Sequence, residues 1–149
     1  MKKATSTIIA LLALISLLML NHPTRANPKD GYDFRIEDVS FWRVYKKKEN
    51  DGVNHVYNAG VLVNNVSPNR EGAVVDIVIE IFNSSDGKLI YRNATRMAID
   101  ADSNRPADFK IYSPLRIQSV HIKARVETPG ENAHVYHAVI LENYQVGGN

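Results

Sequence analysis

Four histidines follow residue 26 and are the side chains best suited to binding a metal ion: His55, His121, His134 and His137. His134 and His137 are three residues apart, a spacing that puts two side chains on one face of a helix but on opposite faces of a strand. The residues around them favour a strand, which argues against a metal pair. Met97 is the only methionine in this part of the chain, which gives a copper site poor support. We therefore expect no metal and no other cofactor.

Nucleophiles and paired carboxylates give no recognisable catalytic pattern either. The chain has no cysteine, and none of its serines lies in a Gly-x-Ser-x-Gly elbow. The segment from Asp100 to Asp108 offers oxygen ligands for calcium, but it lacks the glycine of a calcium loop and contains Arg105, so we expect a solvated loop. We expect a protein that is not an enzyme. A small hydrolase or metal-dependent enzyme, with a site built from distant loops, stays as an alternative.

The first residues have the pattern of an export signal. Lys2 and Lys3 precede an apolar run from Ile8 to Leu20, which is short for a membrane-spanning helix of about 20 residues. Pro23 and the small residues of Thr24-Arg25-Ala26 follow, and we expect cleavage after Ala26. Residues 1–26 are then a signal peptide and residues 27–149 a single domain, periplasmic or secreted from a bacterium, with no integral membrane segment. The alternative is an uncleaved N-terminal anchor.

Composition narrows the class of partner. The chain has 149 residues, of which 44% are hydrophobic and 23% charged, an ordinary balance for a globular domain. Its net charge of +2 comes from 18 basic and 16 acidic residues. Three of the basic residues and none of the acidic ones lie in residues 1–26, which leaves the rest with a net charge of −1. Without a basic excess, we expect no binding to nucleic acid.

The rest of the sequence alternates as β-strands do. Val75, Ile77, Ile79 and Ile81 share one face of a strand, and the polar cluster from Asn83 to Gly87 predicts a hairpin after it. We expect about seven strands in an antiparallel, immunoglobulin-like β-sandwich, an all-β fold. The other predicted strands are residues 32–45, 55–64, 88–92, 107–112, 115–126 and 134–141, with a bulge near residues 118–119, loops at 46–52 and 65–72, and a frayed tail at 145–149.

Part of this pattern resembles the FxLYD family. The similarity is carried by residues 60–65, 75–83 and 86–90 and by Phe109, and the motif that names the family falls on residues 79–83, with conservative departures throughout. FxLYD domains are extracytoplasmic bacterial β-sandwich modules. The resemblance implies an accessory or interaction module without catalysis, and it transfers no functional residues.

The strand around Ile79 also carries apolar residues on its second face, which makes that face a candidate contact surface. Val74, Val78 and Phe82 alternate there with Asp76 and Glu80. We expect Lys123 and Arg125, on a neighbouring strand, to pair with these carboxylates. Either a terminal segment covers the apolar residues, or they form an exposed patch that binds a partner or a second copy.

Trp42 is a second candidate. It follows Phe41 and precedes a lysine-rich segment, Lys46–Lys48. It is either the core tryptophan of a sandwich, which we favour, or an exposed aromatic anchor for a partner or glycan. Only one of two adjacent aromatic residues can face inward on a regular strand.

These observations predict an exported, non-catalytic module that binds another envelope or secreted protein, or a second copy of itself. A glycan- or ligand-binding module is the alternative that shares the same surfaces.

The export signal gives the first testable prediction. The mature protein should begin at Asn27, because a short apolar core followed by a proline and Thr-Arg-Ala is cleaved rather than retained. Mass spectrometry of the exported protein checks this. An intact N-terminus recovered in the membrane fraction would contradict it.

Overall fold

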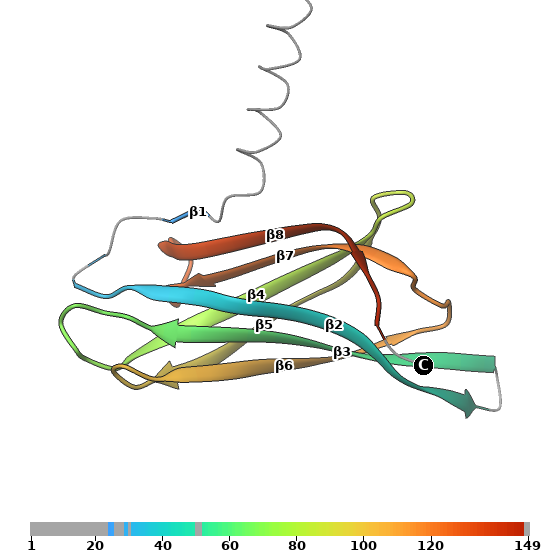
Figure 1. Cartoon of the computed structure of the whole chain (residues 1–149), viewed down its shortest axis with the longest axis horizontal. Helices are drawn as coiled ribbons and strands as arrows, with labels where there is room; N and C mark the ends of the chain where they lie inside the picture. Colours follow the sequence, from blue (N-terminus) through green and yellow to red (C-terminus); the bar gives the residue numbers. More distant parts are fainter. Residues whose placement is uncertain (1–23, 26–28, 30, 50–51, 148–149) are drawn as a thin grey trace, which may run out of the picture.

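The computed structural model describes residues 24–25, 29, 31–49 and 52–147 (Figure 1). These residues form two antiparallel β-sheets and no helix, which confirms the predicted all-β fold. None of them belongs to a helix long and apolar enough to cross a membrane. Most of the predicted signal peptide lies outside this part of the chain. The strands are β1 (Thr24–Arg25), β2 (Phe34–Glu49), β3 (Gly52–Asn65), β4 (Ala73–Asn83), β5 (Leu89–Ile99), β6 (Asn104–Ser113), β7 (Ser119–Glu127) and β8 (Val135–Gln145).

The strands divide into two sheets that lie against each other (Figure 1). One sheet has five strands in the order β1-β8-β7-β4-β5, and the other has three in the order β2-β3-β6. β1 is only two residues long and pairs with β8 at His137 and Ala138. Its residues belong to the segment that we predict to be removed, so the seven longer strands make up the sandwich of the expected mature domain.

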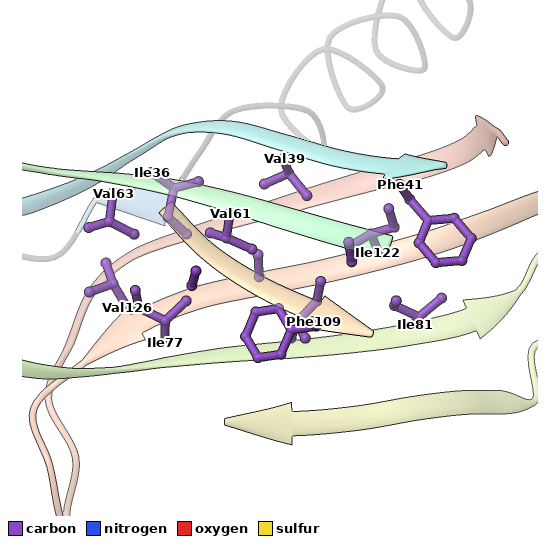
Figure 2. Close-up of a cluster of buried hydrophobic side chains, with 14 of the residues drawn as sticks. Ile36, Val39, Phe41, Val61, Val63, Ile77, Ile81, Phe109, Ile122 and Val126 are labelled. Carbon is purple, nitrogen blue, oxygen red and sulfur yellow. The ribbon is translucent and has the colours of Figure 1, made fainter. Parts of the chain in front are cut away.

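The core lies between the sheets and follows the period-two pattern of the strands. On β4, Val75, Ile77, Ile79 and Ile81 are buried together, as the sequence predicts. Branched residues of β7 lie opposite them in register, with Ile77 beside Val126 and Ile81 beside Ile122. Side chains of the second sheet, including Val61 and Phe109, fill the space between the two layers (Figure 2). A continuous apolar layer therefore holds the sheets together.

The hairpin between β4 and β5 forms where the sequence predicts it. The Asn83 amide donates to the Lys88 carbonyl over 2.8 Å, and the Gly87 amide donates to the Asn83 carbonyl over 2.9 Å. Gly87 has a φ of 68°, in the left-handed region that glycine adopts without steric cost. This glycine closes the turn.

Two predicted loops are in fact strand. β2 continues to Glu49 and pairs with Gly52 of β3, so the loop predicted at 46–52 is a long hairpin. β5 reaches Ile99 and β6 begins at Asn104, which leaves only a short turn in the segment considered for calcium. Asp108 of that segment lies on β6, where it pairs with Gly60. The extensions of the predicted strands at residues 93–99 and 104–106 were missed because polar residues interrupt the alternation there.

The segment before β7 and the C-terminal tail also differ from expectation. β7 begins at Ser119, so Leu115 and Ile117 precede the strand, and the irregularity in register lies between Val120 and Ile122. The tail is held rather than frayed as far as Gly147, whose carbonyl accepts a 2.8 Å hydrogen bond from the Arg43 amide. Residues 148–149 lie outside the described part.

The core gives a prediction about stability. Ile79→Asp should lower the free energy of unfolding by about 3 kcal/mol or more, because the new carboxylate would be buried without a partner. Urea denaturation measures this change. Glu80→Gln, at the next position on the outer face, is the matched control and should cost under about 1 kcal/mol. If the urea midpoint of Ile79→Asp equalled that of the wild type, the assignment of Ile79 to the core would be wrong.

Candidate binding surfaces

The outer face of the five-stranded sheet brings together the residues predicted as a contact surface. On β4, Val74, Asp76, Val78, Glu80 and Phe82 alternate with the core residues. β7 lies beside β4, as expected, with Arg125 opposite Val78 and Lys123 opposite Glu80. The seven predicted residues of this surface are therefore on one face of adjacent strands.

Ion pairs cross this face from strand to strand. Asp76 accepts two hydrogen bonds from Arg96 of β5, over 2.8 and 2.9 Å, and these bonds raise the pKa of the Arg96 guanidinium above its ordinary value. Glu80 lies between Arg92 of β5, at 3.3 Å, and Arg125 of β7, at 3.5 Å. The predicted pairing of β4 carboxylates with β7 thus occurs at Arg125, and β5 supplies two further arginines that the sequence reasoning did not use.

Val78 lies within this network and is only 5% exposed, although it is outside the main core cluster. Its neighbours in register are Ala94 of β5 and Arg125 of β7. The apolar stems of long charged side chains can cover such a residue. The apolar surface is therefore not continuous: Val74 is 48% exposed on one side of Val78, and Phe82 is half-buried on the other.

Phe82 belongs to a shallow hollow on the same face. The Lys123 ammonium lies 5.1 Å from the centre of its ring, within the range of a cation–π contact. The hollow has a volume of about 320 Å³ and is lined by Phe82, Gly87, His121, Lys123, Ile140 and Glu142. His121 is fixed there by its Nδ1, which accepts a 3.3 Å hydrogen bond from the Asn143 amide. The hollow therefore combines apolar and charged side chains beside the predicted contact surface.

The outer face of the three-stranded sheet carries a different feature, exposed aromatic rings. Trp42 is 37% exposed, so its favoured assignment as the core tryptophan is wrong. Phe41 takes the inward position instead, fully buried and stacked on Tyr57 at a ring separation of 5.3 Å. Tyr45 and Tyr112 are also exposed, by 44% and 57%. We call Trp42, Tyr45 and Tyr112 the aromatic surface.

Strand register places these rings together. Val56 of β3 pairs with Tyr45 on one side and Tyr112 on the other. Val56 is fully buried, yet it lies outside the main core cluster and faces away from it, since the next residue, Tyr57, is a core residue. Cross-strand neighbours on one face lie about 5 Å apart, so the two tyrosines flank and cover Val56. The aromatic surface thus has an apolar centre.

Polar groups surround that centre. In the next row, Trp42 pairs with Asn58, and Asn58 pairs with Lys110. The Lys110 ammonium lies 5.8 Å from the centre of the Tyr112 ring. Gly60 lies beside the indole, because a Cβ there would lie in ordinary contact with Trp42, 3.7 Å from its Cζ3. Rings around a buried centre with a polar rim have the anatomy of a protein contact.

Sequence reasoning missed Tyr45 and Tyr112 as surface residues. The signal for Tyr112 was present, because Ala107, Phe109 and Ile111 alternate on the buried face and leave Tyr112 on the other. Tyr45 gave no such signal. A register irregularity between Arg43 and Tyr45 changes the alternation just before it.

The four histidines occupy separate structural positions. The Nδ1 atom of His137 accepts a 3.0 Å hydrogen bond from the Ile36 amide, and His134 packs edge-on against Tyr136 at 5.0 Å. His55 is buried and tilted against Tyr57, and His121 lies in the hollow beside Phe82. Among the described residues, no three histidine, aspartate or glutamate side chains are grouped closely enough to hold a metal ion.

Comparison with known proteins supports the fold. No family model matches the chain, and no curated protein matches it. Structural genomics target SoR45 is similar in structure, with a TM-score of 0.53 and 8% identity over 78% of this chain and 87% of the other. The putative ApaA protein from Bordetella pertussis has a TM-score of 0.50 and 13% identity over 77% of this chain and 97% of its own. At such low identities, the likeness concerns the β fold alone.

The covered position of Val78 can be tested against its exposed neighbour. Val78→Asn should lower the free energy of unfolding by about 1–3 kcal/mol, because it buries an amide among groups that are already paired. Val74→Asn, on the same face of the same strand, should change it by under about 0.5 kcal/mol. Urea denaturation of both variants makes the comparison. Equal midpoints would show that Val78 is as open as Val74.

Proposed function

We propose that this protein is an exported, non-catalytic module that binds another protein of the bacterial envelope or exterior through the aromatic surface. The observation that carries the proposal is the exposure of Trp42, Tyr45 and Tyr112 around a buried Val56. This arrangement suits binding and requires no catalytic residues. The pairing of β2 and β6 with β3 holds the three rings on one face of the sheet.

The side chains of this surface are those that contribute most to protein binding. Tryptophan and tyrosine are enriched among the residues that dominate interface energies, and each buries a large apolar area at low cost in conformational entropy. The rings come from the two edge strands, β2 and β6, and two of them flank Val56 of the central strand β3. Side chains around such a centre can exclude water, which favours binding. Lys110 and Asn58 lie beside the rings and can supply hydrogen bonds at the rim.

The export signal and the resemblance to FxLYD modules support the compartment and the class. Both were inferred from the sequence, and they agree with a β-sandwich that presents one aromatic face. Self-association through the same face is a second form of the proposal, in which Trp42 of one copy contacts the aromatic surface of another. The predicted surface on the five-stranded sheet remains a hypothesis for a second contact, now centred on Phe82 and Lys123 rather than on Val78.

A triple variant tests the aromatic surface. Replacing Trp42, Tyr45 and Tyr112 with serine should abolish capture of a specific protein from the periplasm and the medium of the source bacterium. The fold should persist, because all three rings lie outside the core. Affinity capture followed by mass spectrometry identifies the partner, and titration with the purified partner gives the loss of affinity.

A matched control comes from the other sheet. Leu89→Ser also removes an exposed apolar side chain, and it should leave binding unchanged. Size-exclusion chromatography with light scattering separates a second copy from a different protein. A glycan array probed with the wild type tests the alternative ligand. Retention of the partner by the triple variant, or binding to a glycan only, would refute the proposal.

A further inference from the structure

A second, polar pocket lies at one end of the sandwich, and none of the three residues of the aromatic surface lines it. It has a volume of about 260 Å³ and is lined by Arg43, Arg116, Ile117, Gln118, Gln145 and Val146. Three segments distant in sequence meet there: β2, the stretch before β7, and the end of β8. In Figure 1 the segment that follows β8 runs towards β2, where Gly147 pairs with Trp42. The pocket exists only because the fold brings these segments together.

Hydrogen bonds hold the walls of the pocket in place. The Val146 amide donates to the Gln118 carbonyl over 2.9 Å, and the Arg43 amide donates to the Gly147 carbonyl over 2.8 Å. The Ile117 amide donates to the Tyr57 hydroxyl over 2.7 Å, which ties the third wall to a core side chain. These bonds hold the backbone near both arginines in place, so the backbone needs little ordering when a ligand binds.

The charge of the pocket points to the kind of ligand. Two arginines and two glutamines are among its lining residues, and none of the lining residues is acidic. Four other arginines, at positions 35, 92, 96 and 125, form ion pairs with carboxylates. In the described residues, neither Arg43 nor Arg116 has a carboxylate within ion-pair distance. Two arginines at one pocket, without an acidic partner among its lining residues, favour an anion.

We infer that Arg43 and Arg116 form a binding site for a small molecule that carries an oxyanion group. A guanidinium presents parallel N–H donors that match the oxygens of a phosphate, sulfate or carboxylate. Arg43 and Arg116 would bind the oxyanion from two sides, and Gln118 would contribute a further donor. The volume is slightly below the usual range of about 300–1,000 Å³ for ligand pockets, which suits one anionic group with few additional atoms.

Titration followed by ¹⁵N NMR tests this site, with sodium phosphate, sulfate and acetate as separate probes at constant ionic strength. At least one probe should give saturable shifts of the amide signals of residues 116–118 and 145–147. Phosphate or sulfate alone would identify a tetrahedral oxyanion, and acetate alone would identify a carboxylate. Sodium chloride is the control for screening and should give no saturation.

Arginine variants separate a built site from general attraction. Arg43→Gln and Arg116→Gln should each weaken binding by about tenfold or more, whereas Arg70→Gln, at an exposed loop position, should leave it unchanged. Arg43→Lys keeps the charge but loses the paired donors, and it should bind more weakly than the wild type. No saturation with any probe, or equal losses in Arg70→Gln and Arg116→Gln, would overturn the inference.

Discussion

Adjacent side chains of a β-strand point to opposite faces, and in this protein that constraint decides where the aromatic residues lie. Phe41 is stacked on Tyr57 in the core, so Trp42 must lie outside. The same rule applied to β3 puts Val56 outside because Tyr57 is inside. The aromatic surface is thus a consequence of core packing: the residues that hold the sheets together also determine which rings face the surroundings.

Each outer face carries a buried valine, and the side chains around that valine differ between the two sheets. On the five-stranded sheet, Val78 is buried among ion pairs that join Asp76 and Glu80 to arginines of β5 and β7. On the three-stranded sheet, Tyr45 and Tyr112 cover Val56 and remain exposed themselves. A charged network is well solvated and gains little by contacting a partner, whereas exposed rings gain by leaving water. This difference favours the aromatic surface as the site of binding.

The sequence predicted the parts of the fold that depend on local pattern. The alternation in β4 and the turn glycine, Gly87, both follow from backbone preferences that act over a few residues. The position of Trp42 could not be predicted, because Phe41 and Trp42 compete for one inward site and only the opposing sheet decides between them. The pocket at Arg43 and Arg116 could not be predicted from the sequence either, because it depends on the path of the tail after β8.

That path has a consequence for the edge of the smaller sheet. β2 is an edge strand, and an unpaired edge can recruit strands from other molecules and lead to aggregation. The tail runs alongside β2 at Trp42 and Gly147, where it occupies the Arg43 amide. Gly147 therefore shields this point of the edge from a strand of another copy. Without it the core would be unchanged, but the Arg43 amide would be open to pairing with another molecule.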